Sequence, residues 1–234
     1  MKKKIYLFIL LPAFINLFFI ILYFSGIKSA QQLIAPTVPW LSSDSWRELG
    51  MLEQLQNIYL LAILIIFIKM VITRTLLLEK IFFSLASAFI LFLFLEEIDY
   101  GLHFYELITG EYSGIEVRNW HNEKTGSKQN VRYLKKIADI MMVIWFVILP
   151  LCKFKIRHDF ISVLIPSPWF IATFITAIMM SNLAHFLEDN SFGMIAGVQG
   201  NLAGNVSEFR EASNYYLYLL YVMQLFKTQG GGKK

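Results

Sequence analysis

The sequence predicts an all-α protein, a polytopic membrane helix bundle of about six transmembrane helices, and two observations lead to that class. Of the 234 residues, 56% are hydrophobic and 16% are aromatic, which is too apolar for an ordinary soluble domain. The hydrophobic residues also gather in runs close to the ~20 residues that a helix needs to cross a bilayer. We therefore expect one transmembrane helical domain over residues 1–229, followed by a flexible tail over residues 230–234.

Six apolar runs are candidates for membrane-spanning helices. They lie near residues 5–24, 53–73, 77–98, 135–152, 160–184 and 209–227. The first run contains no charged residue and exceeds the ~7–15 apolar residues that are usual in a signal peptide. Since no A-x-A cleavage pattern follows it, we expect this run to be retained as a helix.

The basic residues predict how these helices are oriented. With both termini in the cytoplasm, the predicted inner segments contain twelve Lys or Arg residues and only two acids, Glu79 and Asp159. This bias is the one that the positive-inside rule describes, so the net charge of +4 reflects membrane orientation. No basic stripe lies apart from the span ends, and we expect no nucleic-acid partner. The single cysteine, Cys152, excludes an internal disulfide and a Cys-rich metal site.

Acids lie unusually deep in three of the predicted spans. Only 15, 13 and 15 residues separate the members of the pairs Lys80–Glu96, Asp139–Lys153 and Glu211–Lys227. If each helix begins at its inner lysine and needs ~20 residues to cross, each acid lies about one turn below the outer surface. His185 reaches a comparable level in a fourth span. This coincidence favours a polar cavity open to the outside, whereas the alternative is that the spans tilt or end early and the acids are hydrated at the interface.

The densest group of ionisable residues follows the third predicted span. On a helix, Glu96 shares a face with Asp99 and Tyr100, whereas Glu97 points elsewhere. Farther along, the spacings of His185 with Asp189 and of Glu208 with Glu211 also place each pair on one helix face. Carboxylates and imidazoles of this kind suit a divalent metal such as Zn, Mg or Mn, and metal-free acid–base catalysis is the alternative. We expect metal ligands among Glu97, His121, His185, Asp189, Glu208 and Glu211.

Two short motifs carry a resemblance to a known group of proteins. The run E-E-I-D-Y-G at 96–101, followed by N-W-H-N at 119–122, resembles an uncharacterised family of bacterial polytopic inner-membrane proteins. That family has an E-E-I-S-W-G-Q-like run and a downstream N-x-H-N tetrad. The chain departs from the pattern where Asp99 and Tyr100 replace Ser-Trp and Leu102 replaces Gln.

The resemblance implies where the protein is located and which residues form its site, but it implies no reaction. It implies a multi-pass protein of the bacterial cytoplasmic (inner) membrane. Together with the predicted orientation, this places the acidic site on the periplasmic or exterior side. The resemblance also implies catalytic roles for Glu96, Glu97, His121 and Asn122.

Three functions fit these features. The first is an integral-membrane enzyme, a metal-dependent lipid-modifying hydrolase or transferase that acts on a lipid headgroup or a lipid-linked glycan. The second is a cation- or proton-binding transporter or channel-type protein, although no polar ladder continues to the inner side. The third is a non-catalytic envelope assembly subunit. The expected partners are membrane lipid for the first function, and an envelope protein or a second copy of the chain for the third.

Overall fold

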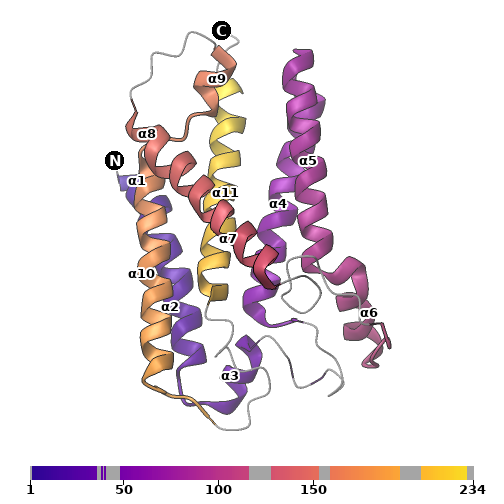
Figure 1. Cartoon of the computed structure of the whole chain (residues 1–234), viewed down its shortest axis with the longest axis vertical. Helices are drawn as coiled ribbons and strands as arrows, with labels where there is room; N and C mark the ends of the chain where they lie inside the picture. The colour runs from indigo at the N-terminus through magenta and orange to yellow at the C-terminus, as the bar shows by residue number, and fades with distance from the viewer. Residues whose placement is uncertain are drawn as a thin grey trace.

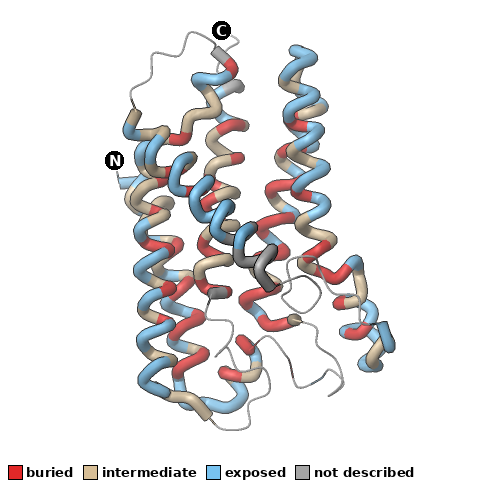
Figure 2. The backbone as a smooth tube through the Cα atoms, viewed as in Figure 1, coloured by how far each residue is buried: buried red, intermediate tan, exposed pale blue. Residues whose placement is uncertain are grey.

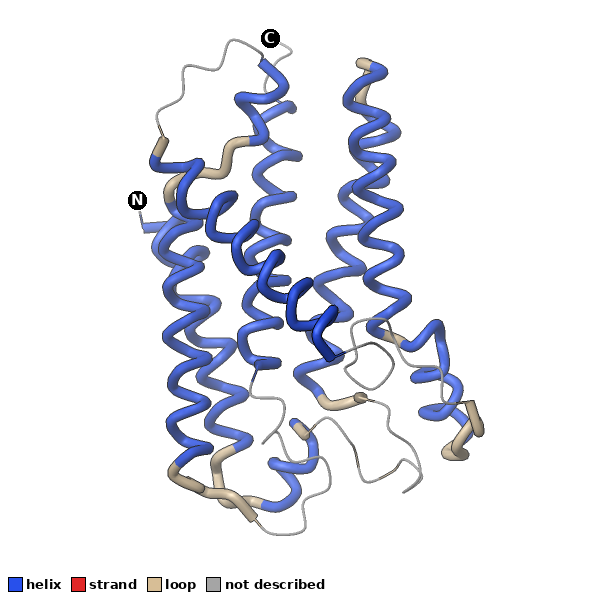
Figure 3. The backbone as a smooth tube through the Cα atoms, viewed as in Figure 1, coloured by secondary structure: helices blue, strands red, loops and turns tan. Residues whose placement is uncertain are grey.

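A computed structural model describes residues 2–35, 38, 40, 48–115, 128–152, 159–195 and 207–230. Every regular element in this part of the chain is a helix, and no strand is found there (Figure 3). This confirms the all-α class that the sequence predicts.

The helices form a bundle in which the long ones lie side by side along the longest axis of the molecule (Figure 1). In chain order they are α1 Lys2–Ile5, η1 Tyr6–Leu10, α2 Leu11–Tyr23, α3 Lys28–Ile34, α4 Met51–Thr73, α5 Leu77–Glu97, η2 Asp99–Gly101, α6 Leu102–Thr109, α7 Lys128–Val143, η3 Ile144–Ile148, α8 Leu149–Leu151, α9 Asp159–Leu164, α10 Trp169–Asp189 and α11 Ser207–Gly230. The start of α1 and the end of α11 lie at the same end of the bundle.

Four helical segments are long and apolar enough to cross a membrane. They are Lys2–Tyr23, Met51–Thr73, Leu77–Glu97 and Phe160–Asp189. Only 11% of the most apolar window of Leu77–Glu97 is buried inside the protein, so most of its hydrophobic side chains face outward (Figure 2). A soluble monomer rarely exposes so much apolar surface, whereas lipid-facing helices do. These four helices are consistent with a membrane protein.

The other two predicted spans are helical but more polar. Residues 135–152 fall in α7, η3 and α8, and residues 209–227 fall in α11. Neither region is among the four segments that meet the length and hydropathy of a membrane span. The sequence predicts about six spans and the described residues contain four such helices, so six spans and cytoplasmic termini remain predictions.

The position of α11 explains its polar composition. The helix lies beside α4 and α10 in the bundle (Figure 1), and its Phe209 and Leu217 are fully buried. Residues of α11 contribute to all three large clusters of buried hydrophobic side chains. A helix surrounded by protein does not need an apolar face toward lipid, so it can carry tyrosines and amides that a lipid-facing helix excludes.

A sharp change of direction follows α5. Asp99 and Tyr100 adopt positive φ angles of 45° and 55°, in the left-handed region that residues other than glycine rarely occupy. Such a conformation costs on the order of 1–3 kcal/mol and persists only where the surroundings hold it. The turn redirects the chain into α6 and leaves the acids of residues 96–99 at the end of the bundle where α4 and α11 begin.

Candidate functional site

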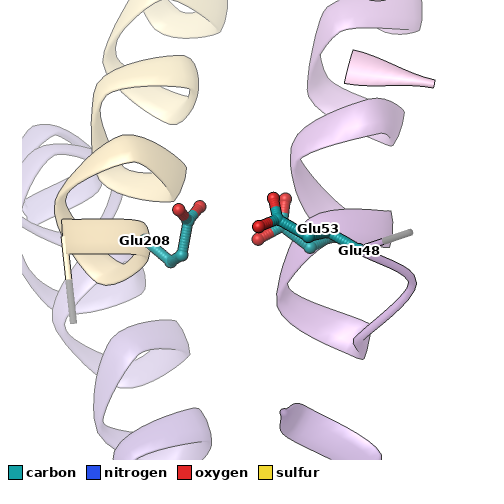
Figure 4. Close-up of side chains that lie close together, drawn as sticks. All are labelled: Glu48, Glu53 and Glu208. Atoms are coloured by element: carbon teal, nitrogen blue, oxygen red, sulfur yellow. The ribbon is translucent and has the colours of Figure 1, made fainter. Parts of the chain in front are cut away.

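Three glutamates from separate parts of the chain meet at this end of the bundle. Glu53 lies in the first turn of α4, Glu208 lies in the first turn of α11, and Glu48 lies just before α4. One carboxylate oxygen from each lies within 4.8 Å of the others. Glu208 points across the interior toward the other two (Figure 4). Glu53 and Glu208 are 6% and 8% exposed and Glu48 is half-buried, so the group is largely shielded from solvent.

Local backbone packing places two of these acids. Gly50 precedes α4, and a Cβ atom added there would lie 2.5 Å from the carbonyl oxygen of Ala35 and 2.6 Å from that of Ile34. Only glycine fits this contact, so the segment that carries Glu48 packs tightly against the end of α3. Acids in the first turn of a helix are favoured by its dipole, which suits both Glu53 and Glu208.

A buried amide joins the same group. Gln56, one turn after Glu53, is 1% exposed, and its Nε2 donates a hydrogen bond of 2.9 Å to Oε2 of Glu208. The other amide atom, Oε1, is buried without a hydrogen-bond partner. A buried polar atom left unpaired costs about 1–3 kcal/mol, which a structure tolerates where the atom has another use.

Glu96 and Glu97, which the sequence predicts as site residues, accept hydrogen bonds from two different tyrosines. The Tyr215 hydroxyl of α11 donates a 2.6 Å hydrogen bond to Oε1 of Glu97. The Tyr100 hydroxyl donates to Oε1 of Glu96. The sequence predicts this pair, but the contact is made through the left-handed turn and not through a common helix face, because α5 ends at Glu97. This hydrogen bond to Glu96 raises the pKa of the Tyr100 hydroxyl above its usual value, so it remains a donor. Each glutamate therefore has a fixed orientation.

Asp99 and His103 form a further polar pair beside Glu96. His103 Nε2 lies 3.2 Å from Oδ2 of Asp99, and the two residues are 4% and 7% exposed. In α6, one turn after His103, Glu106 is buried and accepts a 2.7 Å hydrogen bond from the Ser113 hydroxyl. The reversal after α5 therefore carries a continuous series of buried ionisable side chains.

A groove of about 520 Å³ adjoins the acids, with walls from α4, α5, α7 and α11. Most of its lining is apolar, for example Phe67, Phe89 and Tyr221, whereas its polar lining residues are Asp139, Arg210, Glu211, Asn214 and Tyr215. Arg210 Nη1 lies 3.8 Å from Oδ2 of Asp139, and Nε of Arg210 is buried without a partner. Tyr215 lines the groove and binds Glu97, and Glu211 lines it one turn after Glu208, so the groove reaches the edge of the acidic group.

The structure brings some of the predicted site residues together and leaves others apart. Glu96 and Glu97 close α5 at the end of the bundle where α11, with Glu208 and Glu211 in its first turns, begins (Figure 1). Asp139 lines the groove with Glu211. His185 and Asp189 are exposed on α10, and neither lines the groove nor belongs to the three-glutamate group. His121 and Asn122 lie outside the described residues, so their predicted roles stay predictions.

Three site residues were not among those that the sequence singled out. Glu48, Glu53 and Gln56 lie at the start of the second predicted span, where polar residues are expected in any case. A signal was present in the spacing, because Glu53 and Gln56 are three residues apart and share one helix face within an apolar run. The partner that makes this face significant, Glu208, lies more than 150 residues later in the chain.

Comparison with known proteins yields no match to a family model, a curated protein or a solved structure. The resemblance to the bacterial inner-membrane family therefore depends on two short motifs alone. The first, at residues 96–101, forms the end of α5 and the turn after it. The second, at residues 119–122, lies outside the described residues.

Proposed function

We propose that the protein is an integral-membrane enzyme that acts on a lipid headgroup or a lipid-linked glycan. The observation that carries the proposal is that the apolar groove reaches Glu97 through Tyr215 and includes Glu211, one turn after the buried Glu208. A substrate with an apolar chain and a polar head would match both parts, with the chain between the helices and the head beside the carboxylates. The volume of about 520 Å³ is within the range of ordinary ligand pockets, ~300–1,000 Å³.

The carboxylates support acid–base chemistry on such a head group. Glu53 and Glu208 are buried and close, and two like charges so placed are not both ionised without a counter-ion. One protonated and one ionised carboxyl group is the arrangement that general acid–base catalysis uses. We assign these two residues the proton-transfer roles, and Glu97, oriented by Tyr215, a role in positioning the substrate.

Arg210 supports an anionic substrate group at the polar part of the groove. Its guanidinium is partly exposed and leaves Nε without a partner, although Nη1 is close to Asp139. Arginine binds phosphate and carboxylate through paired N–H groups, so a phosphate-bearing head group suits this position. The reaction class would then be hydrolysis or group transfer at that head group. The proposed location is the periplasmic or exterior side of the bacterial inner membrane, supported by the distribution of basic residues in the sequence.

The interior of the bundle favours this proposal over transport. Conduction needs polar groups along the whole depth of the protein. Two of the deeper polar side chains are bound within the protein: Asn16 donates to the Ser213 hydroxyl at 2.9 Å, and Thr173 donates to the Phe8 carbonyl at 2.8 Å. The groove wall toward Phe67 and Val222 is apolar.

A lipid-turnover assay tests the proposal. The purified protein would be placed in vesicles of total bacterial polar lipid, and head-group release or transfer would be followed by mass spectrometry. Wild-type protein should change the lipid profile, and Glu208→Gln or Glu53→Gln should slow this change by about 10²–10⁴-fold, the usual contribution of acid–base catalysis. Glu111→Gln, which changes an exposed carboxylate beyond α6, is the matched control. An unchanged lipid profile with wild-type protein would contradict the proposal.

A further inference from the structure

The oxygen atoms of Glu48, Glu53 and Glu208 are spaced as ligands of a single ion are spaced. Two atoms bound to one ion lie at most two bond lengths apart, which is about 4.6–5.2 Å for calcium and about 4.0–4.2 Å for magnesium. The three carboxylate oxygens lie within 4.8 Å of one another. This spacing meets the pairwise limit for calcium, and small side-chain movements would bring the three oxygens to the shorter bonds of magnesium or manganese.

Gln56 provides an independent observation that points to a ligand. Its side chain is 1% exposed, its amide lies against Glu208, and its Oε1 has no hydrogen-bond partner. Rotating the amide by 180° exchanges Oε1 with Nε2, and because the two groups are nearly equal in size, the rotation leaves the packing of the side chain unchanged. The oxygen would then lie about 2.9 Å from Oε2 of Glu208. This is close to the spacing of about 3 Å between neighbouring oxygens in an octahedron with bonds of ~2.1 Å.

The surroundings of the group add negative charge. Neither Glu53 nor Glu208 forms an ion pair with a lysine or arginine of the described residues, and Glu211 adds a fourth acid one turn after Glu208. Buried charges in proteins are paired or coordinate metals. A divalent cation between the helices would offset the repulsion among these carboxylates and occupy the unpaired oxygen of Gln56.

We infer that Glu48, Glu53, Glu208 and the amide oxygen of Gln56 bind one hard divalent cation of the magnesium, manganese or calcium class. These ligands are all oxygens, which such ions prefer, whereas zinc favours nitrogen and sulfur. The predicted ligand Glu208 is part of this set, and the exposed pair His185–Asp189 is not. The cation joins α4 to α11 at the end of the bundle where the groove has its polar residues.

The cation deepens the proposed function and rests on it for what the bound ion does. Metal ligands are deprotonated, so with the ion bound Glu53 and Glu208 act as ligands, and the ion takes the place of the proton that they share in its absence. An ion beside the polar part of the groove can coordinate an oxygen of the substrate head group and hold it next to Arg210. The position of the ion rests only on the ligand geometry. Binding and catalysis are therefore separable by experiment.

Manganese binding measured by electron paramagnetic resonance tests the inference. The detergent-purified full chain, stripped with EDTA and desalted, should bind one Mn²⁺ saturably, and Mg²⁺ or Ca²⁺ should compete for the same site. Glu53→Gln and Glu208→Gln should abolish saturable binding, while Glu111→Gln binds as wild type does. Gln56→Leu should weaken binding by about 10–100-fold, as for other groups that support a metal site. Gln56→Glu, which retains an oxygen ligand, should bind at least as tightly as wild type.

Two results would overturn the inference. One is the absence of saturable Mn²⁺ binding to wild-type protein, which would leave the three carboxylates as a proton-sharing group. The other is unchanged binding in Glu208→Gln together with Gln56→Leu. If the glutamate variants fail to fold, as judged by gel filtration and circular dichroism, the opposite effects of the two Gln56 variants decide the question.

The lipid assay separates this inference from the proposed function. Saturable Mn²⁺ binding without any change in lipid supports the cation site and contradicts the enzyme. Lipid turnover that persists in EDTA, by protein that binds no Mn²⁺, supports the enzyme and contradicts the cation site.

Discussion

Two regions with ionisable side chains lie at the same end of the bundle and have opposite surroundings. At the starts of α4 and α11, Glu53 and Glu208 are buried and face one another (Figure 4). At the end of α10, His185 and Asp189 are exposed. The second pair has the better helical spacing for two ligands, four residues on one face. A shared face is therefore not sufficient for a site, because a neighbouring helix must also bring a partner to it.

The largest expected effect is on the rate of lipid turnover, and it tests the contrast between the two regions directly. Turnover of lipid by Glu208→Gln should fall by about 10²–10⁴-fold, roughly 3–5 kcal/mol of barrier, because the buried acid loses its proton-transfer role. His185→Ala and Asp189→Asn should change turnover far less, since these side chains face outward. The initial rate of head-group release, measured at equal amounts of folded protein, compares the variants. An equal loss in the α10 variants would show that the contrast between the two regions is wrong.

A second variant tests how much the hydrogen bond from Tyr215 to Glu97 stabilises the protein. Tyr215→Phe removes the hydroxyl that donates to Glu97 and leaves that half-buried carboxylate without this bond. We expect a loss of about 1–2 kcal/mol in the free energy of unfolding, since hydrogen bonds within membrane bundles are modest. Denaturant titration in mixed micelles measures it. Tyr218→Phe, on the same helix and also lining the groove, is the control and should lose less.

A third variant tests whether the groove binds the acyl chain of a lipid. Ala86 lines the groove, whereas its neighbour Leu85 is 68% exposed on the outer face of α5. Ala86→Trp should fill part of the groove and reduce labelling by a photoreactive acyl lipid about tenfold, equivalent to ~1.4 kcal/mol of binding. Leu85→Trp should label as wild type does. Equal labelling of the two variants would place the lipid elsewhere on the protein.

The smallest effect has the opposite sign and concerns stability. In protein stripped of metal, Glu53→Gln should raise the free energy of unfolding by about 0.5–2 kcal/mol, because it removes repulsion from a crowded group of acids. Asp189→Asn, an exposed change, should stay within about 0.5 kcal/mol of wild type. Thermal unfolding in detergent with EDTA measures both. A destabilised Glu53→Gln would mean that its carboxylate is already compensated within the protein.

Much of the fold could be predicted because hydrophobic length is a local property. The predicted spans 53–73 and 77–98 differ from α4 and α5 by no more than two residues at either end. The predicted span 160–184 was less accurate, because the helix over Trp169–Asp189 continues to the acids and a separate short helix precedes Pro166. The polar composition of α11 also conceals that it is a central helix, since its surroundings are protein.

The candidate site could be predicted only in part. Residues around the end of α5 could be predicted because Glu96, Glu97 and Asp99 are dense in the sequence. The contact of Glu96 with Tyr100 is local in the chain, although the left-handed turn beyond the helix makes it. Glu53 and Gln56 were missed because acids and amides at the start of a span are expected for ordinary hydration. Their burial depends on α11, which the sequence does not place beside α4.

By itself the sequence determined that this chain forms apolar helices with acids gathered toward one end of them. Helix length, hydropathy and charge are properties of neighbouring residues, and no tertiary contact is needed to read them. Only the tertiary structure decided which acids meet, because Glu48, Glu53 and Glu208 come together through the packing of α4 against α11. Electrostatic and ligand interactions depend on distance in space, and the distance between residues far apart in the chain is set by how the helices pack.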